Sequence, residues 1–279
     1  MSNASVGELV HIAAQCRRKV LMMIEACGAG HMGGAMSCLD IVTALYFYKM
    51  KVDPKNPGMK ERDRFILSAG HKCMAQYAAL AQKGFFDEKV LDTYGQLGSK
   101  IPGHPDMHKL PGVEANTGAL GHGLSIALGM ALGLRMDGSK SQVYVIMGDG
   151  ELPEGSNWEA AAAATQYKAD TITTFVDCND LQISGKTADI MDMAPATRFA
   201  AFGWAVTEID GNNMEEIVKV LDSLPITPGK PSCIVAKTIK SKGISFAEGV
   251  GKYHYWKPEA GEMEKAVEEV EKKIKEVCP

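Results

Sequence analysis

The alternation of short apolar runs with longer amphipathic stretches constrains this fold more than any other feature. Apolar runs typical of strands lie at 64–67, 143–147, 171–176, 204–209 and 233–239. Helical patterns lie at 6–26, 39–48 (with Ser37 as its expected cap), 74–83, 121–136, 157–167, 214–221 and 262–276. Strands separated by helices need crossover connections, which make the strands parallel. We therefore predict an α/β fold, a parallel sheet with helices on both faces. We expect a single domain over 1–279, with a C-terminal helix at about 259–279.

Oxygen-bearing side chains follow two of these strands. The segment VYVIMGDGELPEG at 143–155 places Asp149 directly after an apolar run, and Asn179 follows the next run. In parallel sheets, ligands bind at the carboxyl ends of strands. Carboxylate and amide oxygens suit Mg²⁺ or Ca²⁺ rather than zinc, and Mg²⁺ commonly completes its shell with phosphate oxygens. The pattern predicts a metal that holds a phosphorylated ligand, with helix capping as the alternative use of Asp149.

Charge and cysteine content exclude several classes of protein. Lys and Arg number 30 against 34 Asp and Glu, a net charge of −4, so we expect no nucleic-acid partner. The most apolar region, 120–134, is too short and too interrupted by glycine to span a membrane. The seven cysteines form no CxxC pair, which indicates reduced thiols and a cytoplasmic protein.

Two other candidate motifs are weaker than they look. The stretch GAGHMG at 28–33 matches the dinucleotide fingerprint, but a helix precedes it where a strand is required. The chain has no P-loop motif. His104 and His108 have a helical ligand spacing, but Pro105 interrupts any helix between them, which argues against zinc.

The GDG at 148–150 followed by Asn179 resembles the thiamin diphosphate motif, and GDGELPEGSNWEA is similar to transketolases in particular. Other segments follow in that family's order, namely GHMGGAMSCLDIV, LSAGH, QLGSKIPGHPD, GVEANTGALGHGLSIALGMA, AKTIKSKG and His254-x-x-x-Pro258. The resemblance runs from about His31 to Pro258 and covers only the diphosphate-binding half of a transketolase. It implies the N-terminal subunit of a split transketolase, a transferase of carbohydrate metabolism of the pentose phosphate type. Such an enzyme moves a two-carbon ketol unit from a ketose, or its phosphate, to an aldose or its phosphate.

The resemblance also implies roles around the cofactor. The divalent metal, Mg²⁺ or Ca²⁺, would be held by Asp149, Asn179 and the Leu181 carbonyl. Gly150 would let the backbone approach the phosphates. The other expected cofactor contacts are His71 and Lys237 at the diphosphate, Gly118 and Leu120 at the aminopyrimidine, and Ile183 at the thiazolium. Glu154 is expected to be an acid that links cofactor sites across an interface, with a helix cap as its alternative.

Four histidines match positions where transketolases carry active-site histidines, namely His31, His71, His104 and His254. Histidine suits proton transfer at sugar hydroxyls because its ordinary pKa lies near neutrality. For any one of them, the alternative is a loop or surface residue. The substrate end departs from the family at Gly95, where an arginine is usual, and at Ala69, where a polar residue is usual.

The resemblance implies a partner as well. The glutamate that activates the coenzyme belongs to a pyrimidine-binding domain, expected here on a C-terminal transketolase subunit in a hetero-oligomer. The Gly/Ala-rich helix at 121–136 suits close packing against the sheet or against that partner. The main alternative is an α subunit of a 2-oxo acid dehydrogenase or decarboxylase, which carries GDG and Asn but is not expected to show the histidine set or AKTIKSKG. A first-half relative of deoxyxylulose phosphate synthase and a non-enzymatic assembly partner are further alternatives.

Overall fold

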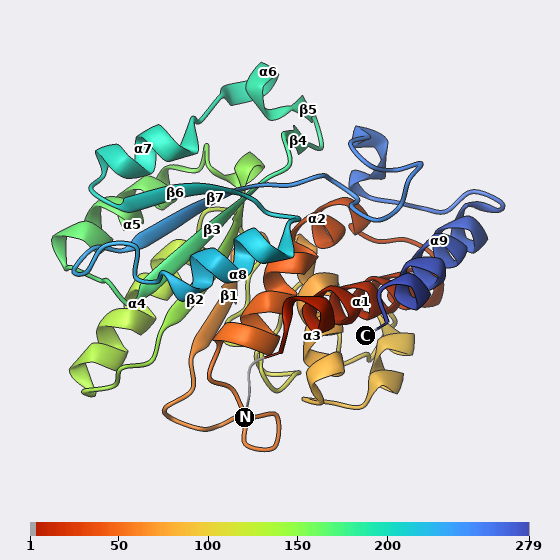
Figure 1. The fold of residues 1–279 in the computed structure, drawn as a ribbon, viewed down its shortest axis with the longest axis horizontal. Coiled ribbons are helices and arrows are strands. Elements are labelled where there is room, and N and C mark those ends of the chain that lie inside the picture. Colours follow the sequence, from red (N-terminus) through yellow and green to blue (C-terminus); the bar gives the residue numbers. More distant parts are fainter. Residues whose placement is uncertain (1–3, 279) are drawn as a thin grey trace.

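The computed structural model describes residues 4–278, and a parallel sheet forms its centre (Figure 1). Within these residues the sheet has five strands in the order β1-β2-β3-β7-β6, and every neighbouring pair is parallel. The strands are β1 (Arg64–Leu67), β2 (Val143–Gly148), β3 (Ile172–Cys178), β6 (Ala205–Asp210) and β7 (Ser232–Lys237). The predicted sheet is confirmed. The predicted domain includes residues 1–3 and 279, which lie outside the described part.

Helices cover both faces of the sheet (Figure 1). One face carries α1 (Val6–Cys27), α2 (Met32–Ala44), α3 (Cys73–Lys83) and α8 (Met214–Asp222), with α9 (Glu262–Glu276) packed on α1. The other face carries α4 (Gly123–Met136), α5 (Gly155–Gln166) and α7 (Pro195–Ala201). No helix in 4–278 combines the length and the apolar character needed to cross a membrane.

The strand β2 shows why two layers form. Successive side chains of a strand point to opposite faces. Tyr144 and Ile146 belong to the core beneath α1–α3, whereas Val143, Val145 and Met147 belong to the core beneath α4 and α5. Both sets are buried, so the sequence of this strand is one continuous apolar run without polar residues at alternate positions.

The second helix begins earlier than the sequence predicts. It starts at Met32 rather than at residue 39, and Ser37 lies inside it instead of capping it. The prediction was wrong because glycine is a poor helix former, so Gly33 and Gly34 indicated a later start. Packing requires them: a Cβ on Gly33 would stand 2.9 Å from Lys240 Cε, and one on Gly34 would stand 2.9 Å from Lys72 Cγ. The early start places His31 at the N-terminus of α2.

The remaining predicted elements agree with the structure to within three residues at each end. The pattern missed only short elements and α7, which are too brief to show a clear period. They include a π-helical turn at Leu45–Lys49, the hairpin β4 (Leu181–Gln182) and β5 (Gly185–Lys186), and α6 (Thr187–Met191). The hairpin follows Asp180, whose φ of +62° turns the chain directly after β3.

Candidate functional site

A cavity of about 340 Å³ lies at the carboxyl ends of β1, β2, β3 and β7. This is where a parallel sheet is expected to bind ligands. The cavity brings together most of the residues that the sequence singled out, although they come from segments more than 200 residues apart. They are His31, His71, His104, Gly118, Leu120, Asp149, Gly150, Asn179, Leu181, Ile183 and His254.

Asp149 joins the ends of two strands. Its Oδ1 accepts a hydrogen bond from the Gly150 amide (2.8 Å), and its Oδ2 accepts one from the Asp180 amide (2.7 Å). Burial raises the pKa of Asp149 to about 6, and the nearby Lys72 charge opposes this rise. Each carboxylate oxygen keeps a second lone pair, and a bound divalent cation would favour the charged form.

Asn179 is oriented by its amide nitrogen. Its Nδ2 donates to Ser37 Oγ (3.1 Å) and to Asp177 Oδ2 (3.5 Å), while its Oδ1 accepts from the Leu181 amide (3.2 Å). Because the NH₂ group is turned into the protein, the oxygen retains a lone pair for a cation. The Leu181 carbonyl, the third predicted ligand, accepts a hydrogen bond from Lys240 Nζ (2.7 Å).

These three oxygens form a donor set that suits Mg²⁺ or Ca²⁺. No group of three or more His, Cys, Asp or Glu residues between 4 and 278 is arranged to hold a metal ion. A metal at this site would therefore depend on the amide and carbonyl oxygens beside the Asp149 carboxylate, with phosphate and water filling the shell. The residues present fit such an ion.

Two lysines that the sequence pattern did not single out line the cavity. Lys72 is buried, and its Nζ lies 2.5 Å from Asp177 Oδ2. Asp177 also accepts hydrogen bonds from Ser37 Oγ and Thr238 Oγ1. Burial, with the charge of Lys72 as a smaller cause, lowers the pKa of Lys240 to about 8. Both lysines come shortly after a strand, β1 or β7, and Lys240 also belongs to the AKTIKSKG segment; such cations suit a diphosphate group.

Lys237 does not lie in this cavity, so its predicted place was wrong. Its side chain is 74% exposed, and its Nζ lies 3.2 Å from Glu208 Oε2 on β6. Strand alternation gives it the same face as Val235, which packs in the core on the α7 side. Lys240 reaches the cavity because the chain has left β7 and turned across the edge of the sheet.

Glu154 is not among the residues that line the cavity either; it is exposed just before α5. It packs beside Gly121, where a Cβ would stand 2.5 Å from Glu154 Cβ. The acid that does line the cavity is Glu151, which is 2% exposed. It accepts hydrogen bonds from Ser68 Oγ and from the Gly121 and Gly148 amides, and burial raises its pKa. Glu151 therefore ties the ends of β1 and β2 to the start of α4.

The four predicted histidines form one cluster. The His31 ring centroid lies 5.2 Å from that of His71, 5.6 Å from that of His254 and 6.3 Å from that of His104. Burial lowers the pKa of His71 to about 2 and those of His31 and His254 to about 4, and it also lowers the pKa of His104. The imidazoles are therefore neutral at pH 7, and each ring offers one hydrogen-bond donor and one acceptor.

Glycines allow the loop at 117–118 to pass close to this cluster. A Cβ on Gly70 would stand 2.5 Å from the Thr117 carbonyl oxygen, and one on Gly118 would stand 3.0 Å from His104 Cδ2. The departure at Gly95 also has a packing reason. Its φ is +69°, and a Cβ there would stand 2.6 Å from Cys27 Sγ, so this backbone has no room for a side chain.

Comparison with known protein families shows to which family this chain belongs. The family described as "Transketolase, thiamine diphosphate binding domain" matches residues 10–271. The chain belongs to this transketolase family. An apulose-4-phosphate transketolase subunit of Phocaeicola vulgatus is 45% identical over 262 residues, which are 94% of this chain and 93% of that protein. The 6-deoxy-6-sulfo-D-fructose transketolase subunit SqwG of Clostridium sp. is 44% identical over 266 residues, 92% of this chain and 97% of that protein.

Solved transketolases share the fold. Transketolase from Campylobacter jejuni superposes with a TM-score of 0.87 at 32% identity, over 95% of this chain and 43% of that one. An arginine variant of the Pichia stipitis transketolase gives 0.88 at 29% identity, over 94% of this chain and 40% of that one. The chain therefore spans about two fifths of these transketolases. Its relatives are transferases of the transketolase type, and the 2-oxo acid dehydrogenase alternative is not favoured.

Proposed function

We propose that this chain is the thiamin diphosphate-binding subunit of a two-subunit transketolase. The assembled enzyme transfers a two-carbon ketol unit from a ketose, or its phosphate, to an aldose or its phosphate. The observation that carries the proposal is the single cavity that holds both the oxygen donors after β2 and β3 and the four neutral histidines.

In this proposal the residues of the cavity hold the cofactor. Asp149, Asn179 and the Leu181 carbonyl would hold Mg²⁺ or Ca²⁺ at the diphosphate, and Lys240 would add positive charge at the same end. Gly150 would let the backbone come close to the phosphates. Gly118 and Leu120 would meet the aminopyrimidine, and Ile183, which is 79% exposed at the rim, would meet the thiazolium. When bound, thiamin diphosphate supplies the nucleophilic carbon and the electron sink that ketol transfer requires.

The histidines act on the sugar. A neutral imidazole can take a proton from one hydroxyl and donate a hydrogen bond to another, which ketol transfer needs at each carbonyl and alcohol. His104 and His254 are the proposed substrate contacts, while His71, the most buried of the four, is the proposed contact at the diphosphate end. The relatives named after apulose-4-phosphate and 6-deoxy-6-sulfo-D-fructose act on anionic ketose derivatives, which supports a sugar phosphate or a similar anion as a substrate here.

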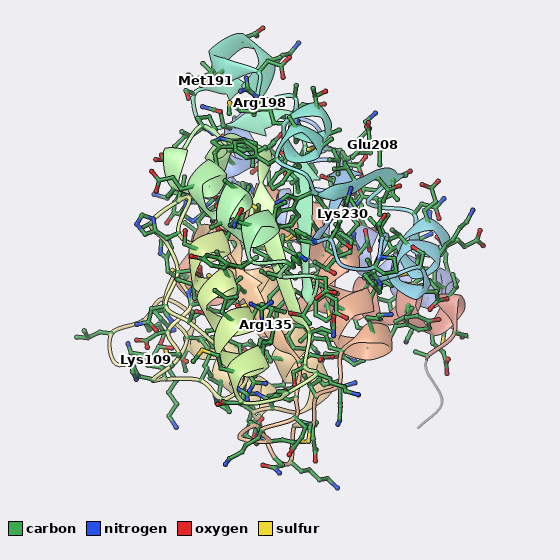
Figure 2. All side chains as sticks on the ribbon, turned by 90° about the vertical axis from the view of Figure 1, so that its left-hand side faces the viewer. Lys109, Arg135, Met191, Arg198, Glu208 and Lys230 are labelled. Atoms are coloured by element: carbon green, nitrogen blue, oxygen red, sulfur yellow. The ribbon has the colours of Figure 1, made fainter. Side chains whose placement is uncertain are left out.

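A partner subunit completes the proposed site, and the names of the relatives support this because they too are called transketolase subunits. The helix α4 packs its Leu124 face on the sheet and leaves the opposite face uncovered (Figure 2). That face carries Gly129 and Gly133, where an added Cβ would meet nothing within 4 Å, and ends at Met136, which is 87% exposed. A flat face beside Gly118 and Leu120 suits a second chain with a pyrimidine-binding domain, which would supply the activating glutamate. We expect an obligate interface, on the order of 2,000 Å² or more. Exposed Glu154, beside this face, would lie at that interface.

Cofactor binding tests the first part of the proposal. In the assembled enzyme, Asp149→Ala should abolish calorimetric binding of thiamin diphosphate with Mg²⁺, because the metal loses its anionic protein ligand. Asp180→Asn, at an exposed acid that follows Asn179, is the matched control and should bind as the parent does. Equal affinity in the Asp149 variant would refute the assigned metal site.

Reconstitution tests the second part. The chain should be inert alone with saturating cofactor and Mg²⁺, and it should turn over ketose donors and aldose acceptors at about 1–10³ s⁻¹ once its companion subunit is added. Products are followed by mass for a panel of sugars and sugar phosphates. Turnover at such rates by the chain alone would show that no partner is needed.

A further inference from the structure

Two side chains of α3 hold the segment that carries His104. Cys73 and Tyr77 lie one turn apart on α3, on the same side of the helix, and both are completely buried. They contact three consecutive backbone carbonyls, those of Pro102, Gly103 and His104. We call residues 102–104 the histidine segment.

The contacts are specific hydrogen bonds. Tyr77 Oη shares its proton between the carbonyl oxygens of Pro102 (3.0 Å) and His104 (2.9 Å). Cys73 Sγ donates to the Gly103 carbonyl oxygen (3.1 Å). Burial raises the pKa of Tyr77 far above its usual value and that of Cys73 to about 12, so both groups keep their protons and stay donors at neutral pH.

The position of the His104 ring depends on the position of its backbone. No hydrogen bond of that imidazole occurs among residues 4–278, and the side chain is exposed on the wall of the cavity. Its close neighbour is Gly118, whose missing Cβ leaves room for the ring. A shift of the histidine segment would therefore move the imidazole directly.

The same helix also positions His71, which lies in the turn Gly70–Lys72 immediately before α3. The helix α3 therefore fixes the positions of both histidines. His71 is fixed because it directly precedes the helix in the chain, and the segment of His104 is fixed by hydrogen bonds from side chains of the helix. The His31 ring, at the N-terminus of α2, neighbours both, with its centroid 5.2 Å from that of His71 and 6.3 Å from that of His104.

We propose that Tyr77, assisted by Cys73, is a positioning residue that fixes the His104 imidazole relative to His31 and His71. Its effect on turnover rests on the proposed function, in which His104 contacts the sugar. The effect on the geometry of His104 does not, because it concerns this chain alone.

The first test needs no partner and no activity. In the chain labelled with ¹³C at histidine Cε1, the His104 resonance is assigned by its loss in His104→Ala. Tyr77→Phe should shift or broaden this resonance, while those of His11 and His108 stay unchanged. Tyr46→Phe is the matched control, because it removes a buried hydroxyl from a tyrosine whose ring packs against other aromatic rings, while the hydrogen bonds to the histidine segment come from Tyr77. A His104 resonance that superimposes on the parent's in Tyr77→Phe would overturn the proposal.

The second test uses the assembled enzyme. Tyr77→Phe should lower kcat/KM roughly 10–100-fold, since a misplacement on the order of 1 Å can cost 10²-fold, and should leave the Kd of thiamin diphosphate within about twofold. Tyr46→Phe should keep full activity. If the parent transfers ketol units, unchanged kcat/KM in Tyr77→Phe would refute an effect of this positioning on turnover, whatever the resonance shows. If the parent enzyme shows no ketol transfer, the proposed function fails, and the resonance alone decides the role of Tyr77.

Discussion

The buried ion pair under the cavity allows a sharp prediction of stability. Lys72 and Asp177 have side chains that are 4% and 0% exposed, and Lys72 Nζ lies 2.5 Å from Asp177 Oδ2 beside the proposed metal site. Burial by itself would lower the pKa of Lys72, but the Asp177 carboxylate outweighs it and the pKa is raised. Substitution Lys72→Met keeps the length of the side chain and removes its charge. The hydrogen-bond donors that remain on the buried Asp177 carboxylate are the hydroxyls of Ser37 and Thr238 and the Asn179 amide, and the partly desolvated Lys240 is the remaining cation that interacts with it.

The expected loss follows from this burial. Breaking a buried pair by removing one partner costs about 3–5 kcal/mol, because an uncompensated charge remains inside the protein. A domain of ordinary stability has about 5–15 kcal/mol in total, so the variant should lose a large share of it. In the double variant Lys72→Met/Asp177→Asn neither position carries a charge, while the amide oxygen introduced at position 177 still accepts hydrogen bonds. We expect this double variant to regain most of the loss and to lie within about 1–2 kcal/mol of the parent.

Urea unfolding of the isolated chain measures these differences. The control is Lys273→Met, which removes a lysine whose side chain is 59% exposed and lies 3.8 Å from Glu276. An exposed pair of this kind contributes little, so its removal should change the free energy of unfolding by less than about 0.5 kcal/mol. A loss below about 1 kcal/mol in Lys72→Met, or a double variant less stable than the single one, would refute the reasoning.

Three further predictions concern the cavity. Lys240→Met should weaken thiamin diphosphate binding about tenfold or more in calorimetry, because a hydrogen bond from a charged group to the diphosphate is lost. The control Lys237→Met should bind the cofactor as the parent does, and equal effects of the two substitutions would contradict the placement of the two lysines. His104→Ala and His254→Ala should each lower kcat/KM about 10²–10⁴-fold and spare cofactor affinity, and full activity in both would remove them from the mechanism. The folded-state pKa values of His31 and His254, about 4, lie below the ordinary 6.5, so the unfolded chain binds more protons and stability should fall as pH drops from about 6.5 towards 4. His31→Gln should flatten this slope in urea unfolding at pH 7 and pH 5, and an unchanged slope would contradict it.

Much of the architecture could be predicted from local pattern. Strands buried on both faces are continuous apolar runs, and the helices between them are long enough to show their period. The side chains directly after β2 and β3 were also predictable, because parallel strands end at one edge and bring Asp149 and Asn179 to one place. The main exception was the start of α2, where glycines stand inside the helix at 33 and 34 because Lys240 and Lys72 leave no room for a Cβ.

The sequence by itself therefore determined the class of fold, the edge of the sheet that carries the site and most residues around the cavity. The tertiary structure decided which of several similar side chains faces inward. Lys240 rather than Lys237 and Glu151 rather than Glu154 line the cavity. The reason is that side-chain direction depends on strand alternation at β7 and on the turn after β2, and a shift of one residue reverses it. The contact of Tyr77 with the His104 segment joins residues 27 positions apart through backbone carbonyls, which leave no trace in side-chain pattern.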